Sequence, residues 1–380
     1  KGRKIHEGVE KAGLLAHSPL VGNALIDMYG ECGFLVKAQH VFDNLPEQDI
    51  ISWNVLISGY VQYGCYDQAW NCFHRMQKEG LSPSIITFVC ILKACGSIEA
   101  IAEGEKIHRD IMNEGLLDKD ARLGTALLDM YAKCGELEKA QKVLDSLCAH
   151  DVVPWNALMV GYNKQRKGGD ALSCFEQMQS EGLSPDAITY VFALKACGNT
   201  RSVHRGENIH NQIIVKGFLK QNLMLSTALV DMYAKCGMLT KARELHDKQP
   251  LRDVISWNAL LSGYVECEHD HEALQCFEQM QNENVSPDVV TFICILKACG
   301  SRRAFEMGKQ IHDEIVARGI LENNVMLGTA LVDMYAKCGM LARAEHVLDS
   351  LPTRTAVSWC ALVSGYAKKG QGHEALNCFE

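Results

Sequence analysis

Asparagine and threonine side chains recur at one place in a repeated pattern, and they are the groups in this chain best suited to recognise a ligand. Asn54, Asn156 and Asn258 each directly follow a tryptophan. An amide offers both a hydrogen-bond donor and an acceptor, and a threonine hydroxyl can act as either. A single asparagine near a helix start is usually a cap or a solvated residue. The recurrence, with other positions varying around it, instead favours recognition through hydrogen bonds.

Groups that could catalyse a reaction are scarce. His312-Asp313-Glu314 matches the H-x-E half of a zinc deaminase signature. The P-C-x-x-C half is missing, and His6, His108 and His210 occupy the same place without that glutamate. We interpret these histidines as structural. With no nucleophile–base arrangement and no glycine loop to cradle a phosphate, the sequence predicts no catalytic residue, no metal site and no cofactor.

The 17 cysteines would suit a disulfide framework, but their positions follow a repeat. Cys72, Cys174, Cys276 and Cys378 are each 102 residues apart, and so are Cys32, Cys134, Cys236 and Cys338, and Cys95, Cys197 and Cys299. Each lies in an apolar helical pattern, and no C-x-x-C occurs. We therefore predict small buried thiols in a reducing compartment rather than disulfides or zinc ligands.

Four tryptophans reveal the period that positions these groups. Trp53, Trp155, Trp257 and Trp359 are spaced by 102 residues. A spacing kept to the residue predicts a stacked repeat architecture, because an insertion within a unit would break the stack. Apolar residues recur around each tryptophan with the i, i+3, i+4, i+7 spacing of one helix face, so we place the tryptophans in the core.

Each 102-residue period divides into three helix pairs of 35, 36 and 31 residues. No stretch alternates long enough to predict a strand. A single pair cannot bury its apolar faces, whereas stacked pairs can. We therefore predict an all-α fold, a right-handed α-solenoid with the first helices on its concave side. The predicted units are 1–18 (part of a 36-residue unit), 19–49, 50–84, 85–120, 121–151, 152–186, 187–222, 223–253, 254–288, 289–324, 325–355 and 356–380 (part of a 35-residue unit).

Composition sets further bounds on the function. The 380 residues are 47% hydrophobic and 22% charged, and the formal net charge of −8 argues mildly against a general polyanion binder. No apolar run approaches 18 residues, so we predict no membrane span. No signal or transit peptide is visible. Because Lys1 lies within a repeat pattern and Glu380 within a helix pattern, we expect a fragment of a longer protein.

The chain resembles the pentatricopeptide repeat (PPR) family along its whole length. The motifs that carry the resemblance are S-W-N-A-L-L-S-G-Y from Ser256, L-K-A-C-G from Leu296 and T-A-L-V-D-M-Y-A-K-C-G from Thr329. With units of 35, 36 and 31 residues, it is similar to the plant PLS subclass, in which P, L and S repeats alternate. The related tetratricopeptide family keeps a constant 34-residue period. The resemblance implies binding of single-stranded RNA, one base per repeat.

The resemblance further implies that the fifth residue of a unit hydrogen-bonds a base edge, with the last residue helping. A wrong base would leave a polar group unpaired, at about 1–3 kcal/mol per position. The implied pairs are Asn23 with Asp49 (for U), Asn54 with Ser84 (C), Thr125 with Asp151 (G), Asn156 with Asp186 (U), Thr227 with Asp253 (G), Asn258 with Asp288 (U) and Thr329 with Thr355 (a purine). The 36-residue units carry Val89, Val191 and Ile293, which cannot read a base edge. Cys360 stands where asparagine is usual. The implied RNA is 5′-U-C-n-G-U-n-G-U-n-R-3′.

Two further sets of residues complete the predicted site. The resemblance implies that the second residue of a unit packs on base faces, and the candidates are Ile51, Val153, Ile255 and Val290. Lysines recur at the ends of first helices, where they could contact phosphates, and these are Lys133, Lys164, Lys235, Lys337 and Lys368. In isolation such lysines are favourable helix C-terminal charges. Five phosphate contacts would give a salt slope of about −3 on single strands.

We interpret the chain as the guide portion of an organellar factor for C-to-U RNA editing, located in chloroplasts or mitochondria. The resemblance implies protein editing cofactors that dock on the L repeats. The chain itself is not expected to be an enzyme, because a deaminase domain would lie C-terminal to these residues. A peptide-binding scaffold is the alternative, and the net charge of −8 favours it slightly. The alternating unit lengths and the pairing of Asn or Thr with Asp favour RNA more strongly.

Overall fold

The computed structural model describes residues 2–117, 119–147, 151–220, 222–322 and 324–378. These residues form helices joined by short turns, and none of them lies in a strand. They divide into two compact halves, residues 1–192 and 193–380, and helix α13 (Ala187–Thr200) contains the boundary. The predicted all-α fold is confirmed.

The N-terminal half consists of consecutive helices of up to 13 residues before α13. They are α1 (Gly2–Lys11), α2 (Leu14–His17), α3 (Pro19–Glu31), α4 (Leu35–Asp43), α5 (Ile50–Gln62), α6 (Tyr66–Lys78), α7 (Ile85–Ser97), α8 (Ile101–Asn113), α9 (Ala121–Lys133), α10 (Leu137–Ser146), α11 (Val152–Lys164) and α12 (Gly168–Ser180).

The C-terminal half continues the same order after α13. Its elements are α14 (Val203–Val215), the 3₁₀ turn η1 (Phe218–Lys220), α15 (Leu223–Lys235), α16 (Leu239–Asp247), α17 (Val254–Glu266), α18 (Asp270–Asn282), α19 (Val289–Arg302), α20 (Phe305–Ala317), α21 (Val325–Lys337), α22 (Leu341–Ser350), α23 (Ala356–Lys368) and α24 (Gly372–Asn377).

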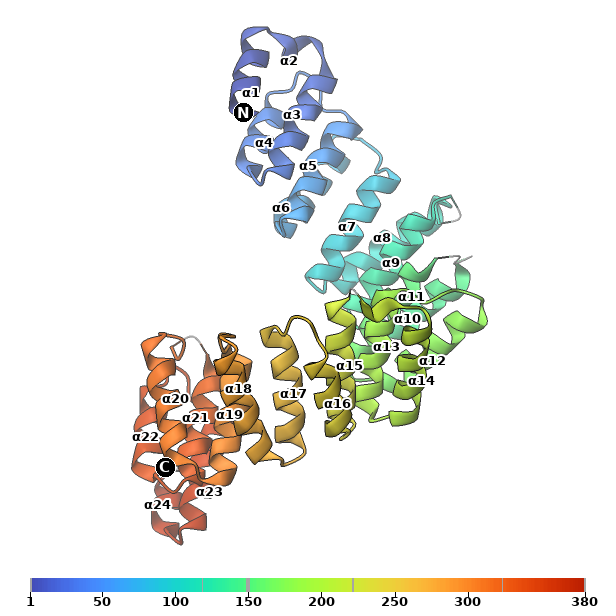
Figure 1. Cartoon of the computed structure of the whole chain (residues 1–380). Coiled ribbons are helices and arrows are strands. Elements are labelled where there is room, and N and C mark those ends of the chain that lie inside the picture. The colour runs from blue at the N-terminus through green and yellow to red at the C-terminus, as the bar shows by residue number, and fades with distance from the viewer. Residues whose placement is uncertain (1, 118, 148–150, 221, 323, 379–380) are drawn as a thin grey trace. The chain divides into compact units, whose positions relative to one another are not determined.

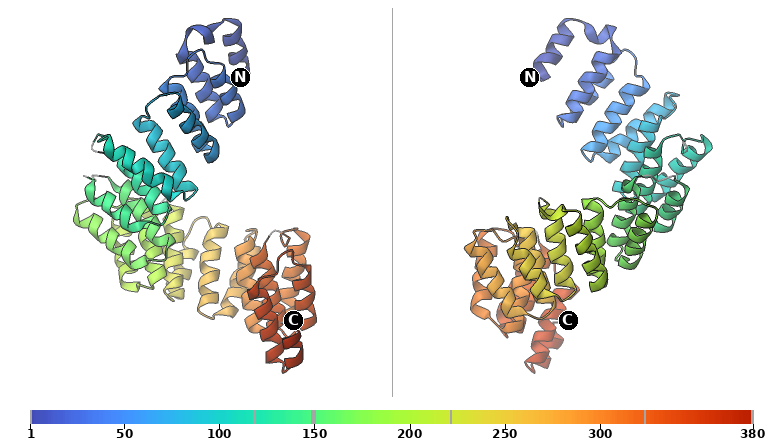
Figure 2. Two further views of the ribbon diagram at one scale, coloured as in Figure 1. Left: turned by 180° about the vertical axis from the view of Figure 1, so that it is seen from behind. Right: turned by 45° about the vertical axis from the view of Figure 1, so that its right-hand side comes forward.

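Each half is a stack of helix pairs (Figure 1). In the N-terminal half, α5 packs on its pair mate α6 and on the first helix of the next pair, α7. In the C-terminal half, α21 packs in the same way on α22 and α23. The succession of paired helices is visible from two further sides in Figure 2. First helices begin at residues 19, 50, 85, 121, 152, 187, 223, 254, 289, 325 and 356, while the assignment of unit classes remains a prediction.

Most first helices begin there with a side-chain N-cap from the last residue of the preceding unit, although Ser18 and Asp151 make no such bond. Asp49 accepts a 2.8 Å hydrogen bond from the backbone N–H of Ser52, and Asp253 accepts one of 2.9 Å from Ser256. Ser84 and Asp288 form capping boxes with the threonine three residues later. These side chains satisfy N–H groups that the helix itself leaves unpaired.

The tryptophans lie in the core, as predicted, wherever both neighbouring pairs are present. Trp53 and Trp257 are fully buried, and Trp155 is 2% exposed. Trp359, in the last pair, is only half-buried. The indole N–H groups of the three buried tryptophans have no hydrogen-bond partner among the described residues. Their contribution is therefore apolar packing between successive pairs.

The recurring histidines bridge neighbouring helix pairs. The Nδ1 atoms of His6, His108, His210 and His312 lie 2.8–3.0 Å from the hydroxyls of Tyr29, Tyr131, Tyr233 and Tyr335. Burial lowers the pKa of His108, His210 and His312. These contacts agree with the predicted structural role, and the described residues contain no group of His, Cys, Asp and Glu that could hold a metal ion.

The cysteines follow the prediction of burial for two of the three series. Cys95, Cys197 and Cys299 are buried, as are Cys72, Cys174 and Cys276, while Cys378 is half-buried. Burial raises the pKa of the Cys174 and Cys276 thiols to about 12, so these thiols stay protonated. The prediction is wrong for Cys32, which is exposed, and Cys134, Cys236 and Cys338 are half-buried. These four cysteines directly follow the last residue of a first helix, at its C-cap.

Glycine allows the first helices of adjacent pairs to approach closely. A Cβ atom on Gly300 would lie 3.3 Å from the Cα atom of Met334 on the next first helix. This approach explains the glycine of the L-K-A-C-G motif and fixes the spacing between α19 and α21. None of the described helices is long and apolar enough to cross a membrane.

Candidate nucleic-acid interface

The predicted base-reading residues lie in the first two turns of the first helices. A helix that begins at the first residue of a unit places its second and fifth residues on the same face, three positions apart. Because first helices of successive pairs pack side by side, these faces form a row within each half. The N-cap of the next first helix, which is the last residue of the unit, lies beside this row.

The structure joins the predicted pairs in the 35-residue units. Asn258 Nδ2 donates to Asp288 Oδ1 at 3.0 Å, and Asn54 Nδ2 donates to Ser84 Oγ at 3.0 Å. Asn156 Nδ2 donates to Asp186 Oδ1 at 3.5 Å, which is a weaker contact. Each asparagine is 8% exposed, so its side chain is held against the next pair rather than free in solvent.

A threonine that the sequence did not single out completes two of these sites. Thr291 Oγ1 donates to Asn258 Oδ1 at 2.7 Å, and Thr87 Oγ1 donates to Asn54 Oδ1 at 2.5 Å. A hydroxyl donor on one side and an oxygen acceptor on the other fix which way the amide points. The asparagine keeps one N–H and one oxygen lone pair for a ligand. The signal was available, since a threonine stands at the third position of the next unit.

The aspartates of this network remain ionised. Burial acts to raise the pKa of Asp288, but hydrogen bonds from the backbone of Thr291 and the amide of Asn258 outweigh it and lower the pKa. The pKa of Asp186 is lowered against burial in the same way, by Thr189 and Asn156. An ionised carboxylate accepts hydrogen bonds only, so it orients the asparagine through its N–H group.

The 31-residue units arrange their pairs differently. The Asn23 amide is buried with no hydrogen-bond partner among the described residues, while Asp49 only caps the next helix. The hydroxyls of Thr125 and Thr329 donate to the carbonyls four residues earlier, at 3.0 and 2.9 Å. The Thr227 hydroxyl is buried without a described partner.

The last residues of these units act mainly as caps. Asp253 and Thr355 cap the following helices, whereas Asp151 is exposed and makes no side-chain capping bond. In the described 31-residue units, the fifth and last residues therefore do not hydrogen-bond to each other. Of the remaining fifth positions, Val89, Val191 and Ile293 are half-buried, and Cys360 is exposed.

The second residues form the most regular exposed feature of this face. Ile51, Val153, Ile255 and Val290 are 49–63% exposed, although all are large aliphatic side chains. Six more second residues that the sequence analysis did not name are exposed as well. They are Leu20, Ile86, Ile188, Met224, Met326 and Val357. We call these ten residues the aliphatic row, and the predicted frame alone would have found all of them.

Most of the predicted phosphate-binding lysines already pair with a carboxylate. Lys133, Lys235 and Lys337 lie 2.7, 2.7 and 2.8 Å from an aspartate four residues earlier. Lys164 lies 2.5 Å from Glu99, and Lys368 is exposed without an ion pair to another described residue. The i, i+4 spacing of Asp and Lys could have been read from D-M-Y-A-K in the sequence. These ion pairs make the row of lysines nearly neutral. Phosphate contact by these lysines stays a prediction.

One cavity in the N-terminal half gathers several predicted site residues. It has a volume of about 750 Å³ and is lined by Val89, Thr125, Asp151 and Val153, together with Lys93 and Arg122. It therefore joins the fifth residues of two units to a last residue and a second residue. A volume of this size lies in the range of small-molecule sites.

The stacked helix pairs, with a row of polar and aliphatic side chains along the first helices, define a helical-repeat protein. A family model described as the PPR repeat family matches residues 48–97, 150–199 and 252–301. A second model, described as the PPR repeat, matches residues 23–50, 125–152, 226–248 and 357–380. The chain belongs to the PPR repeat family.

Two relatives from Arabidopsis thaliana illustrate the similarity. The chain is 35% identical over 379 residues to the pentatricopeptide repeat-containing protein At1g11290, chloroplastic, a match that covers 100% of this chain and 46% of the relative. It is 32% identical over 380 residues to the pentatricopeptide repeat-containing protein At2g03380, mitochondrial, covering 100% and 54%. The chain thus spans about half the length of these relatives.

A solved structure has the same fold. The crystal structure of the maize pentatricopeptide repeat protein PPR10 in complex with an 18-nt psaJ RNA element superposes with a TM-score of 0.75. The match covers 95% of this chain and 54% of that one, at 18% sequence identity. This likeness confirms the predicted solenoid of helix pairs.

Proposed function

We propose that this chain binds single-stranded RNA in a sequence-specific manner, one base per repeat. The observation that carries the proposal is the network of Asn258, Asp288 and Thr291, which fixes an amide beside the exposed aliphatic row. An amide with one donor and one acceptor left over suits the polar edge of a base. An exposed aliphatic side chain three residues away suits the apolar face of that base.

The proposed RNA is 5′-U-C-n-G-U-n-G-U-n-R-3′, with its 5′ end at the N-terminal units. The family membership and the RNA in the PPR10 crystal structure support binding to RNA. The alternation of 35-, 36- and 31-residue units supports membership of the PLS subclass. The near neutrality of the lysine row suggests that base contacts contribute more than phosphate contacts to affinity.

In the cell, we propose that this chain is the guide portion of a C-to-U editing factor in chloroplasts or mitochondria. The compartment is supported by relatives named chloroplastic and mitochondrial. In this proposal the chain selects the RNA, protein cofactors dock on the 36-residue units, and the deaminase activity resides outside these residues. The chain is then a binding protein rather than an enzyme.

A peptide-binding scaffold is the second candidate. It is favoured by the carboxylates that neutralise Lys133, Lys164, Lys235 and Lys337, since a strong RNA binder would ordinarily leave such cations free. In that case the asparagine amides and the aliphatic row would hold an extended peptide.

Binding to matched and scrambled RNA separates these candidates. A labelled strand with the proposed sequence is titrated against a strand of equal composition in scrambled order, at two salt concentrations. We expect tighter binding of the matched strand, with a salt slope shallower than about −3 because most lysines are paired. Equal affinity for both strands would refute sequence reading, and absence of binding to either would favour the scaffold.

A reciprocal exchange tests the residue assignment. Thr227 and Asn258 are fifth residues of adjacent units, and both are assigned an aspartate partner, Asp253 and Asp288. Asn258→Thr should shift the preference at its base from U toward G, and Thr227→Asn should shift its own base from G toward U. Each variant serves as the control for the other, because the rest of the site is unchanged. Preferences that stay in place would show that these residues do not read the bases.

A further inference from the structure

Three serines occupy the same place in the loops that precede first helices, and each is directly followed by proline. They are Ser82, Ser184 and Ser286, at intervals of 102 residues. All three are exposed and lie outside the helices. Because proline disfavours the helical conformation in the residue before it, each serine lies in an extended or turn segment. A hydroxyl on such an exposed loop is accessible to a modifying enzyme.

The loop around Ser286 faces an arginine that is fixed in place. Arg318, the C-cap residue of α20, has its Nη1 atom 3.5 Å from Ser286 Oγ. The same atom donates to the carbonyl of Pro287 at 2.8 Å, and Nη2 donates to Glu314. The guanidinium carbon lies 5.2 Å from the centre of the Phe292 ring. These contacts hold the guanidinium beside the serine hydroxyl.

This arrangement suits a phosphate better than it suits a hydroxyl. At 3.5 Å, the contact between Arg318 Nη1 and Ser286 Oγ is weak for a hydrogen bond. A phosphoryl group on Oγ would carry a charge of about −1.5 to −2 at pH 7, with three acceptor oxygens beyond the hydroxyl position. A guanidinium held in one orientation matches the geometry of such a group and forms charge-assisted hydrogen bonds with it.

The other two serines lack this arginine. Arg318 follows Ser286 by 32 residues, whereas the residue 32 positions after Ser184 is Lys216 and the residue 32 positions after Ser82 is Glu114. A carboxylate at that position repels a phosphate, while a cation attracts it. The three copies therefore form a series in which the loop of Ser286 is the best suited to hold a phosphate and the loop of Ser82 the least suited.

We propose that Ser286 is a phosphorylation site and that Arg318 holds the phosphate. The donor is ATP, and the enzyme is a protein kinase that accepts proline directly after the serine. Ser286 Oγ attacks the γ-phosphorus, and a new P–O bond forms while the bond from the γ-phosphorus to the oxygen that bridges to the β-phosphate breaks. ADP leaves, and the hydroxyl proton passes to the catalytic aspartate of the kinase.

The phosphate would also affect the candidate RNA-binding site. Ser286 lies two residues before Asp288, which accepts the hydrogen bond from Asn258. Negative charge added at this place repels the phosphates of a bound RNA. At a separation of about 10 Å and physiological salt, this repulsion should weaken RNA binding by about threefold. This consequence rests on the proposed function, whereas the modification itself does not.

Phosphorylation of the folded chain tests the site. The whole chain is incubated with ATP and a purified kinase that prefers Ser-Pro, and mass spectrometry of its peptides locates the phosphate. We expect phosphate on Ser286, and Ser286→Ala should lose this phosphate while Ser82 and Ser184 remain available to the kinase. Absence of phosphate from Ser286 in the folded wild-type chain would overturn the proposal.

Phosphorus NMR tests the role of Arg318. Two variants each keep one Ser-Pro serine, either Ser286 or Ser82, with alanine at the other two positions. The second pKa of phosphoserine is about 6, and a neighbouring guanidinium should lower it by about 0.5 at Ser286 but not at Ser82. Arg318→Gln should remove this difference, and circular dichroism checks that the variant is folded. Equal pKa values for the phosphates on Ser286 and Ser82, a comparison that leaves Arg318 unchanged, would refute the role of the arginine.

RNA binding separates this proposal from the proposed function. The variant that keeps only Ser286 is titrated with the matched strand before and after phosphorylation. We expect the phosphorylated form to bind about threefold more weakly, with a larger difference at lower salt. If the unmodified chain does not prefer the matched strand over a scrambled one, the proposed function fails, while phosphate on Ser286 with a lowered pKa still supports the modification site. Equal affinities of the two forms, with the preference intact, would refute the effect on RNA.

Discussion

Two 31-residue units of the C-terminal half, residues 223–253 and 325–355, fill equivalent core positions with different chemistry. The later unit has Leu348 and Leu351, both at least 95% buried, and Gly328. The earlier unit has His246, Gln249 and Ser226 at the same positions. We call residues 223–253 the polar unit and residues 325–355 the apolar unit. His246 is completely buried, and Gln249 is 5% exposed. The second helix is nine residues long in the earlier unit and ten in the later one.

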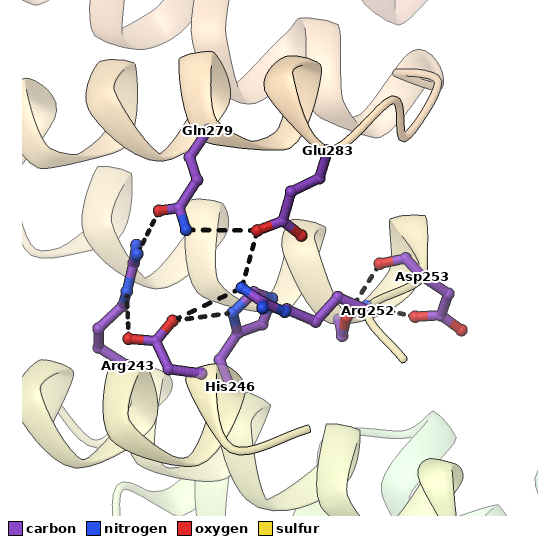
Figure 3. A network of polar contacts seen from close by, with 8 residues as sticks. Arg243, His246, Arg252, Asp253, Gln279 and Glu283 are labelled. Atoms are coloured by element: carbon purple, nitrogen blue, oxygen red, sulfur yellow. Dashed lines mark hydrogen bonds and ion pairs between the residues drawn. The ribbon is translucent and has the colours of Figure 1, made fainter. Parts of the chain in front are cut away.

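A network of polar contacts surrounds His246 in the earlier unit (Figure 3). Arg243 Nε lies 3.0 Å from Asp247 Oδ2, and Arg252 Nη1 lies 2.8 Å from Glu283 Oε1. Arg243 also donates to Gln279, so the network connects α16 to α18 of the next pair. His246 itself packs edge-on against Trp257 with ring centroids 4.3 Å apart. Its Nδ1 atom lies 3.8 Å from Asp247 Oδ1, which is too far for a hydrogen bond, and neither ring nitrogen has a hydrogen-bond partner among the described residues.

The comparison shows which parts of a repeat must change together. Gln249 Nε2 donates to Ser226 Oγ at 3.2 Å, so the glutamine has a partner because glycine has become serine. In the apolar unit a Cβ atom on Gly328 would lie 2.3 Å from Leu351 Cδ2. Gly328 with Leu351 is thus one way to fill this part of the core, and Ser226 with Gln249 is another. The histidine has no such compensation, which makes it the weak point of the polar unit.

The largest effect is expected from transferring the histidine alone. Leu348→His places an imidazole in the apolar unit, where the packing of the buried leucine would be lost. We expect a loss of about 4 kcal/mol in unfolding free energy at pH 7. Segment-resolved hydrogen exchange of residues 325–355 measures it. The control is His246→Leu, which should stabilise residues 223–253 or leave them unchanged. A loss below about 1 kcal/mol in Leu348→His would mean that the apolar unit tolerates the polar group as well.

Acid should weaken the polar unit more than the apolar one. Burial lowers the pKa of His246 to about 4, with help from the positive charges of Arg243 and Arg252 and against the opposing effect of Asp247. The unfolded chain, with a pKa of about 6.5, binds a proton in the pH range where the folded unit does not. The unfolding free energy of the polar unit is therefore at its full value above about pH 6.5. It decreases as the pH falls toward 4, by about 3 kcal/mol in total.

Hydrogen exchange at pH 7 and pH 4.5, corrected for intrinsic rates, tests this pH dependence. The difference between the two pH values for residues 223–253 should disappear in His246→Leu. Residues 325–355 provide the internal comparison, because leucine stands at the equivalent position. If His246→Leu keeps the full loss of protection in acid, other groups are responsible for it.

A smaller change in unfolding free energy is expected when the serine and glutamine of the polar unit replace Gly328 and Leu351 in the apolar unit. Gly328→Ser alone should cost about 1–2 kcal/mol, because the new Cβ displaces Leu351. Combining it with Leu351→Gln should recover about 1 kcal/mol of the summed single losses, through the hydrogen bond that Ser226 and Gln249 make. A double-mutant cycle on denaturant unfolding measures this coupling. Strict additivity would show that the serine–glutamine contact does not stabilise the earlier unit.

The fold was predictable from the sequence because its determinants are local. The 102-residue period, the apolar stripe around Trp257 and the N-cap residue before each first helix specify where helices begin and which face is buried. Burial of Cys32 was predicted wrongly, whereas its half-buried counterparts Cys134, Cys236 and Cys338 lie 3.8–3.9 Å from a carbonyl of the preceding first helix. That contact is between residues 39 apart, so the pattern within one unit does not indicate it.

The candidate site was predictable in part. Asn258 and Asp288 are 30 residues apart, so their hydrogen bond depends on how α17 packs on α19, and no spacing within one helix indicates it. The ion pair of Lys133 with Asp129 could have been read from the i, i+4 spacing. The exposed Met224 and Met326 follow from the unit frame alone. Long-range contacts were therefore the part that the sequence could not supply.

The smallest effect concerns Arg252, which connects the polar unit to the next pair. Its ion pair with Glu283 is partly exposed, so Arg252→Ala should cost only about 0.5 kcal/mol at pH 7. The same change removes a positive charge that lowers the pKa of His246. The pKa of His246 in the folded state should therefore rise toward 6.5, closer to its value in the unfolded chain. As a result, the loss of unfolding free energy between pH 7 and 4.5 should become smaller. Arg354→Ala, at the equivalent position of the apolar unit, is the control and should leave the acid response unchanged. An acid response in Arg252→Ala equal to that of wild type would mean that burial and Arg243, without Arg252, keep His246 neutral.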